Sequence, residues 1–389
     1  MSKNENLEIH KTPNAGLQFL VEMFEQTHSA MQTQAARSVD IALVVRNWLF
    51  GWYIIEFEGG GADRADLYGK NLINLLSQQL NALHIKGMSP TNLRKFREFY
   101  SAYSKIRQAA PVTSFLEQLS LRKVQQAMPV KSSGTIEIPA LMPVFNALKQ
   151  RFKLGWTHYV TLLSIKNPDE RSFYEIESIE NNWGYRELGR QINASLFERL
   201  ALSRNKDEIK SLSRNGQIVE KPRDIIKNPY ILEFTDLEER TSYSENDLET
   251  ALINRLEQFL LELGKGFLFE ARQKRFSFDN NHFYVDLVFY NRLLRSYVLI
   301  DLKIGDLKHQ DLGQMQMYVN YFDRFIKTDT ENPTIGILLC HSKQNELVEL
   351  TLPKGSNIYA SEYMLYLPSK EELKSQLEDV QRDWDNRHG

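Results

Sequence analysis

Three absences limit what this chain can be. It has one cysteine, Cys340, which excludes an internal disulfide framework and any zinc site built from cysteines. No apolar run approaches the roughly 18 residues of a membrane-spanning helix, and the polar start MSKNENLEIHKTPN is unlike a signal peptide. The 48 Lys and Arg residues are balanced by 50 Asp and Glu residues, so no overall positive charge attracts nucleic acid. We therefore expect a cytoplasmic protein without membrane contact, in which a nucleic-acid partner would be indicated by local charge alone.

The chain has the length and composition of an ordinary globular protein with two or three domains. It has 389 residues, of which 42% are hydrophobic and 25% are charged. The first part shows apolar residues at the three- and four-residue spacing of helices, whereas strand patterns follow later. Between them, Arg190 to Lys227 carries nine Lys and Arg against five acids and reads as a basic connector. We predict a helical domain over residues 1–230, linker included, and an α/β domain over residues 231–389.

A helical hairpin at residues 72–103 has the layout of a helix-turn-helix. A turn with Gly87 follows the first helix, and Ser89 and Pro90 are a favourable N-cap and first residue for the second. From Lys86 to Arg107 there are six Lys and Arg and one acid, which makes a local basic patch. We expect the second helix to read DNA, although an ordinary hairpin with a solvated basic face would show the same pattern. The side chains that we expect to contact DNA are Arg94, Lys95 and Arg97.

Two adjacent apolar segments dominate the second part of the chain. Phe283–Asn291 and Ser296–Lys303 are rich in β-branched and aromatic residues and are apolar on both faces, as in central strands of a covered sheet. A short turn joins them. If Asn291 pairs with Ser296, then Asp286 falls directly opposite Asp301, since each lies five residues further from the turn.

Two facing carboxylates in an apolar sheet destabilise it unless a cation lies between them. Oxygen ligands of this kind suit Mg²⁺ or Mn²⁺. Lys303 shares a face with Asp301, because the two are two residues apart in a strand. The alternative interpretation is a pair of sheet-edge aspartates for which Lys303 is a salt-bridge partner. The opposing register and the burial on both sides favour a metal site.

A third acid comes from the helix before these strands. Ser244 is a good N-cap with Asp247 at the third position, and the helix is expected to run to Leu263. Glu249 falls near the centre of its apolar stripe, where a carboxylate needs a cationic partner. A first-turn Glu favoured by the helix dipole is the alternative. The other elements expected here are a strand at Phe267–Phe278, a helix from about Asp311 to Lys327 with Gln314 and Tyr318 on one face, a parallel strand at Thr334–Cys340, an edge strand at Ile358–Leu367 and a helix at Glu371–Arg387.

This order of elements, with these acids at these places, resembles the PD-(D/E)XK nuclease superfamily and, more narrowly, the YhcG family of nucleases. The resemblance covers most of the chain. It is carried by SENDLETALI, FLLELGKGF, RQ at 272–273, VDLVFY and NPTIGILLC in the second half, and by GMSPTNL and GWTHY in the first. It implies a restriction-endonuclease-like α/β domain with a mixed sheet, preceded by a helical domain that binds DNA.

The resemblance also implies a function, namely metal-dependent hydrolysis of DNA by an enzyme that pairs as a homodimer. Lys303 would face the attacking water or the phosphate, and Gln314 and Tyr318 would orient the substrate phosphates or the lysine. The chain departs from the family at Asp301, where Glu is usual. A catalytically inactive DNA-binding or assembly protein with the same fold is therefore the alternative function, and RNA is an alternative substrate. The predicted ligands of Mg²⁺ or Mn²⁺ are Glu249, Asp286, Asp301 and the backbone carbonyl of Leu302.

Overall fold

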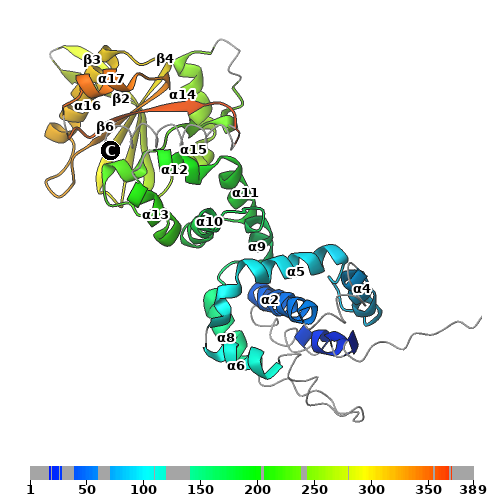
Figure 1. Cartoon of the computed structure of the whole chain (residues 1–389). Helices are drawn as coiled ribbons and strands as arrows, with labels where there is room; N and C mark the ends of the chain where they lie inside the picture. Colours follow the sequence, from blue (N-terminus) through cyan, green and yellow to red (C-terminus); the bar gives the residue numbers. More distant parts are fainter. Residues whose placement is uncertain are drawn as a thin grey trace, which may run out of the picture. The chain divides into compact units, whose positions relative to one another are not determined.

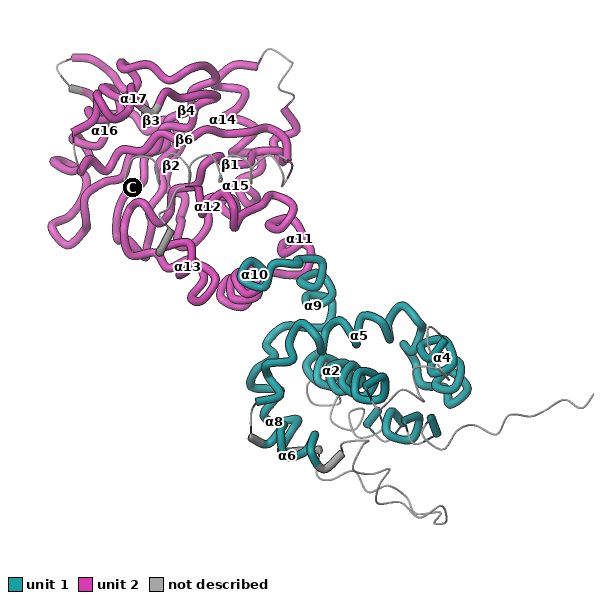
Figure 2. Tube along the Cα trace, viewed as in Figure 1, with its two compact units in different colours: residues 1–171 teal, residues 172–389 magenta. Residues whose placement is uncertain are grey.

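The chain forms two compact units, Met1–Arg171 and Ser172–Gly389 (Figures 1 and 2). The architecture comes from a computed structural model. The residues that it describes are 17–18, 20–25, 27–28, 39–59, 71–108, 110–119, 141–202, 206–237, 243–278, 280–353, 355–367 and 369.

The first unit is helical in its described part, as the sequence predicted. None of the helices described there or later in the chain is long and apolar enough to cross a membrane. The helices are α2 (Val39–Glu58), α4 (Leu72–Ala82), α5 (Pro90–Ala102), the 3₁₀ turn Ser104–Gln108, α6 (Ala110–Leu119), α8 (Leu141–Arg151) and α9 (Trp156–Leu162).

Helix α5 begins as predicted and packs closely on α2. The Ser89 side chain accepts a hydrogen bond from the backbone N–H of Asn92 at 3.3 Å, and Gly87 in the preceding turn has a positive φ of 85°. At the crossing, a Cβ on Gly51 would lie 2.0 Å from the carbonyl oxygen of Phe96, so the approach of the two helices requires glycine. The buried residues of α5 are Leu93, Phe96, Phe99 and Tyr100.

The second unit is built on a six-stranded mixed sheet in the order β1-β6-β5-β4-β3-β2. Strands β2, β3 and β4 are antiparallel, and β4, β5, β6 and β1 are parallel. The predicted strands are confirmed, except that β6 is not an edge, because the short β1 pairs with it. The strands are β1 (Tyr230–Ile231), β2 (Phe267–Phe278), β3 (Asn281–Asn291), β4 (Ser296–Asp306), β5 (Ile335–Ser342) and β6 (Ile358–Met364).

Helices cover both faces of this sheet and give it two cores. Leu248, Leu252 and Phe259 pack on one face with alternate residues of β3, β4 and β5. Met315 and Phe322 pack on the other face, where Cys340 is also buried. The helices are α10 (Pro168–Glu180), which contains the division between the units, α11 (Tyr185–Asn193), α12 (Leu196–Leu202), α13 (Lys206–Asn215), α14 (Glu245–Asn254), α15 (Leu256–Leu263), α16 (His309–Phe325) and α17 (Asn345–Thr351), with 3₁₀ turns at Pro222–Ile225 and Glu233–Thr235.

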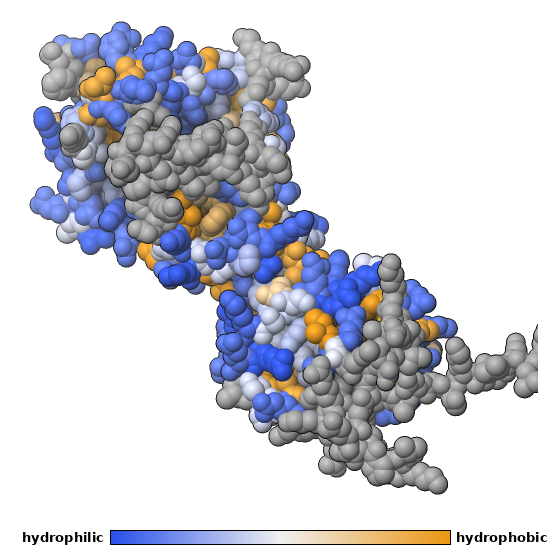
Figure 3. Space-filling view, viewed as in Figure 1, coloured by the Kyte–Doolittle hydropathy of each residue, from blue (hydrophilic) through white to orange (hydrophobic). Residues whose placement is uncertain are grey.

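Two predictions about helices were wrong or incomplete. The helix expected from Ser244 to Leu263 is broken at Arg255, whose φ of −119° and ψ of 35° separate α14 from α15. Helix α17 was not predicted. The predicted helix at 371–387 lies outside the described residues. On the face shown in Figure 3, most of the coloured surface is hydrophilic, and apolar patches are scattered.

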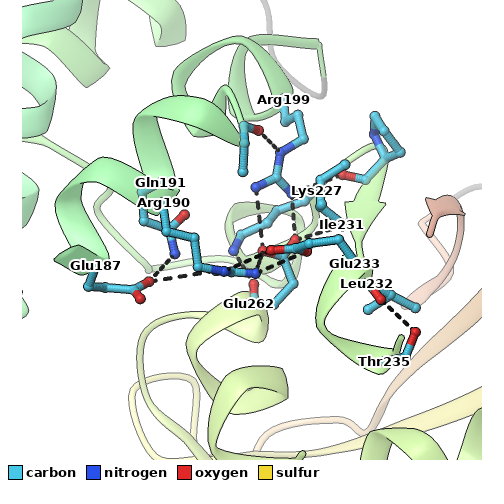
Figure 4. Close-up of polar contacts among 12 residues, drawn as sticks. Glu187, Arg190, Gln191, Arg199, Lys227, Ile231, Leu232, Glu233, Thr235 and Glu262 are labelled. Carbon is cyan, nitrogen blue, oxygen red and sulfur yellow. Dashed lines mark hydrogen bonds and ion pairs between the residues drawn. The ribbon is translucent and has the colours of Figure 1, made fainter. Parts of the chain in front are cut away.

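The basic segment predicted as a connector is instead part of the second unit. Its Arg199 is fully buried and donates from Nη1 to Glu262 Oε1 of α15 at 2.5 Å. Lys227 donates to the backbone carbonyl of Glu262, and the backbone N–H of Ile231 donates to Glu262 Oε1 at 3.0 Å (Figure 4). Burial would raise the pKa of Glu262, but Arg199 and Lys227 outweigh it and the pKa is lowered. This pairing attaches the segment to α15, and the second unit begins at Ser172, well before the predicted boundary at residue 230.

Candidate active site

The predicted pairing of β3 with β4 is confirmed, and it stops next to the two aspartates. The ladder runs from Asn291 opposite Ser296 to Leu287 opposite Ile300. The next pair would be Asp286 with Asp301, but no ladder pair forms there. Instead, Asp286 Oδ2 accepts a hydrogen bond of 2.8 Å from the backbone N–H of Leu302. The strands thus part where the acids lie, and a carboxylate takes the place of a backbone acceptor.

Asp286 and Asp301 lie close together. Asp301 is 2% exposed. Its pKa is raised to about 7, first by burial and then by the negative charge of Asp286. A carboxyl group that resists ionisation beside another carboxylate indicates a place where a cation would be stabilising.

Lys303 is held beside this pair. Its Nζ lies 2.9 Å from Asp301 Oδ2 and 3.7 Å from Glu245 Oε2 on the first turn of α14. Burial lowers the pKa of Lys303, but the carboxylates, Asp301 foremost, outweigh that effect and the pKa is raised. The ammonium group therefore stays charged at the point where the strands part.

Glu249 is buried on α14 at the same end of the sheet, and two side chains of β2 hold it. Arg272 Nε donates to Glu249 Oε1, and Gln273 Nε2 donates to Glu249 Oε2. The same Gln273 nitrogen donates to Asp286 Oδ1 at 2.9 Å, so one amide joins the helix acid to the strand acid. Sequence reasoning gave Arg272 and Gln273 no role. The signal would have been the register of β2, which places residue 273 across from Asp286.

The two remaining predicted residues lie together on α16. Gln314 Nε2 donates to the hydroxyl of Tyr318, whose ring is 1% exposed and packs on Phe276 with centroids 5.5 Å apart. The pKa of Tyr318 is raised, first by burial, while the Gln314 hydrogen bond lowers it and the charges of Asp301 and Asp286 raise it further. The hydroxyl is therefore within electrostatic reach of the acids, and the ring belongs to the core.

The oxygen atoms of the predicted metal ligands are of the kind that a hard divalent cation binds. Their arrangement in the structure differs from the predicted one, in which all of them surround one ion. Within the described residues, no group of three or more His, Cys, Asp and Glu side chains is placed to hold a metal ion. The amide of Gln273 lies between Glu249 and Asp286, and Asp301 interacts with the carboxylate of Asp286 and the ammonium group of Lys303. Carboxylate oxygens and a backbone carbonyl are ligands that Mg²⁺ and Mn²⁺ accept, and the repulsion felt by Asp301 is one that such an ion would relieve.

The predicted DNA-reading residues of α5 are not equally available. Arg94 is exposed, whereas Lys95 and Arg97 are half-buried. Arg97 Nη1 also pairs with Glu58 Oε1 at 2.9 Å, with 42% of the arginine side chain exposed. Of the three side chains that are predicted to contact DNA, Arg94 presents its charge most fully.

Comparison with known proteins identifies the family. The chain is 37% identical over 347 residues to "Putative nuclease YhcG" of Escherichia coli (strain K12), with 89% of each chain covered. The chain belongs to the YhcG family. Residues 223–378 match the family described as "YhcG PDDEXK nuclease domain", and residues 24–138 and 139–199 match the "DUF1016 N-terminal domain". These matches change over between residues 199 and 223, after the division between the compact units and before the predicted boundary.

The YhcG family match and the architecture agree with the predicted fold class. The second unit has a mixed six-stranded sheet with helices on both faces, a restriction-endonuclease-like fold, and the first unit is helical. Among solved structures, the chain is similar to a repair endonuclease from Pyrococcus abyssi, with 20% identity and a TM-score of 0.22. That similarity covers 33% of this chain and 50% of the other.

Proposed function

We propose that this YhcG-family protein is a Mg²⁺- or Mn²⁺-dependent nuclease that hydrolyses phosphodiester bonds in DNA. The observation that carries the proposal is the pair Asp286 and Asp301, with Lys303 Nζ 2.9 Å from Asp301, at the point where β3 and β4 part. Two acids and a lysine at the point where two strands part do not stabilise a fold by themselves. They are suited to holding a cation and a phosphate.

Each residue of the site has a distinct part in this proposal. The bound ion would polarise the scissile phosphate and lower the pKa of a bound water. Lys303 supplies a positive charge that offsets the negative charge developing on the phosphate in the transition state. Gln314 and the Tyr318 hydroxyl orient the phosphate or the lysine. The groups that would hold the ion are Asp286, Asp301, Glu249 and the backbone carbonyl of Leu302.

The first unit would bring this site to DNA. Arg94, Lys95 and Arg97 on α5 are the proposed contacts, with Arg94 the most exposed. Where these side chains contact phosphates, they give affinity that falls steeply with salt. A homodimer would place two sites on opposite strands.

The test is a cleavage assay on plasmid and linear DNA, with an RNA arm, in EDTA, Mg²⁺ or Mn²⁺. Asp301→Ala and Lys303→Ala should each abolish cleavage while the protein stays folded in thermal melting. Asp306→Ala is the matched control, because Asp306 lies on the same strand, is exposed and bonds to Ser342 Oγ at 2.5 Å. Cleavage that persists in both variants, or that needs no divalent ion, would refute the proposal.

A second candidate function is DNA binding or assembly without cleavage. It is favoured by Asp301 in place of the family's usual Glu, and by the absence of a ready three-acid metal group in the described part of the chain. Thermal melting separates the two functions. If the metal site is intact, adding Mn²⁺ should raise the melting temperature, because an ion that binds only the folded state stabilises that state. If the site no longer binds metal, Mn²⁺ should leave the melting temperature unchanged.

A further inference from the structure

Strand β2 carries a backbone outlier at Gln273. Its φ is +48°, in the left-handed region that residues other than glycine seldom adopt. The neighbouring residues pair regularly, Arg272 with Leu287 and Lys274 with Val285, so the outlier is confined to the residue across from Asp286. Such conformations persist where the surroundings hold them, and they gather at functional sites.

The side chain of Gln273 explains what holds the outlier. Its Nε2 donates to Glu249 Oε2 and, at 2.9 Å, to Asp286 Oδ1. The two acceptors come from α14 and β3, which are far apart in sequence and carry like charges. Both hydrogens of one NH₂ group thus lie between two carboxylates, where they supply partial positive charge.

Arg272 completes this arrangement from the neighbouring position. Its Nε donates to Glu249 Oε1, and its Nη2 donates to Thr250 Oγ1 at 3.0 Å. Glu249 is 3% exposed and therefore has little contact with water. Residues of β2 donate hydrogen bonds to both of its carboxylate oxygens. A buried carboxylate of this kind requires such compensation.

We propose that the Gln273 amide, supported by Arg272, stands in for the divalent cation in the metal-free protein. This inference rests on the proposed function. The oxygens that the amide satisfies, Glu249 Oε2 and Asp286 Oδ1, are among those assigned to the ion, and an oxygen that accepts these hydrogens is not available to it. Gln273 is therefore a positioning residue that keeps the acids together without metal and gives way when the ion binds.

This role predicts that metal will rescue the loss of the amide. In EDTA, Gln273→Leu should melt several degrees below the wild-type full-length chain, because Glu249 and Asp286 then lose the amide hydrogens that lie between them. With saturating Mn²⁺ the difference in melting temperature between the variant and the wild type should disappear. The variant should bind Mn²⁺ about tenfold more tightly by calorimetry, since roughly that factor corresponds to one hydrogen bond to a charged group.

Two further variants make the test specific. Gln273→Asn keeps an amide and suits the left-handed backbone, but it is one methylene too short to reach both acids, so it should behave as Gln273→Leu does. Gln316→Leu is the control, because Gln316 donates to the neutral Asn320 Oδ1 at 3.2 Å on exposed α16 surface. Any decrease in the melting temperature of Gln316→Leu should be the same with and without Mn²⁺.

The outcomes separate this inference from the function on which it rests. If Mn²⁺ shifts the wild type but the Gln273 variants show equal deficits with and without it, the amide is merely structural and the inference fails alone. If Mn²⁺ leaves the melting temperature of the wild type unchanged, the proposed metal site and the inference fail together.

Discussion

Asp286 Oδ2 accepts a 2.8 Å hydrogen bond from the backbone N–H of Leu302, which lies two residues beyond Ile300 of the last regular pair of β3 and β4. The Asp286 carboxylate thus accepts a hydrogen bond from a backbone N–H of β4 at a point where the β3–β4 ladder no longer continues. An aspartate used in this way cannot move far from β4, so its second oxygen is held toward Glu249 and Gln273. The parting of the strands therefore fixes where the acids gather.

The repulsion between the two aspartates predicts that the site weakens the metal-free fold. Asp301→Asn should raise the free energy of unfolding in EDTA at pH 8 by about 1–2 kcal/mol, because burial and Asp286 raise the pKa of Asp301 to about 7 and its charge is unfavourable there. Chemical denaturation measures this, with Asp306→Asn as the control. A variant less stable than the wild type would show that Lys303 already compensates the charge.

The buried pair Arg199 and Glu262 predicts a large loss of stability when one partner is removed. Both side chains are 0% exposed, so Arg199→Met removes the nearest cation from a buried carboxylate and should cost about 3–5 kcal/mol. Adding Glu262→Gln, which keeps an acceptor for the Ile231 N–H, should recover part of that loss. The exposed pair Arg255 and Asp236, 2.9 Å apart, is the control, and Arg255→Met should cost less than about 1 kcal/mol. Equal losses at the two pairs would contradict the prediction.

Lys227 predicts a pH dependence of stability. Burial lowers its pKa to about 8, against about 10.4 in an unfolded chain. Between these values the unfolded state binds a proton that the folded state has lost, so the free energy of unfolding rises with pH. Relative to Lys227→Met, the wild type should gain stability from about pH 8 to pH 10, by no more than about 1.4 kcal/mol per pH unit. A flat or falling difference in denaturation curves would count against this.

The unequal exposure of α5 predicts unequal effects on DNA binding. Arg94→Gln should weaken binding to duplex DNA and reduce the slope of log affinity against log salt by about one. Arg97→Gln should do less, because Glu58 already neutralises much of its charge. Fluorescence anisotropy over a salt series measures both, with the exposed Arg151→Gln of α8 as the control. If Arg94→Gln matches the control, α5 is not the DNA-reading helix.

Local patterns were sufficient to predict much of the fold. The apolar runs around Asp286 and Asp301 gave the central strands, and the short turn fixed the register of Asn291 with Ser296. The capping box at Ser244 with Asp247 gave the start of α14. These features depend on residues near one another in the chain, where propensity and spacing are informative.

What the sequence could not supply depends on distant partners. Arg199 and Glu262 are 63 residues apart, and nothing in the basic composition around Arg199 indicates a buried acid. Likewise, the hydrogen bonds of Gln273 join Glu249 of α14 to Asp286 of β3, and these three residues are far apart in the sequence. The composition of residues 190–227 therefore suggested a connector, whereas the structure buries Arg199 and Lys227 of this segment.

Cys340 has a practical consequence for distance measurements. It is the only cysteine in the sequence, it is buried in β5, and burial raises the pKa of its thiol to about 12. Reagents that attack thiolates should therefore leave it untouched in the folded protein. A cysteine introduced at an exposed site such as Arg94 would be the sole point of attachment for a spin label or dye, and no background thiol would first have to be removed.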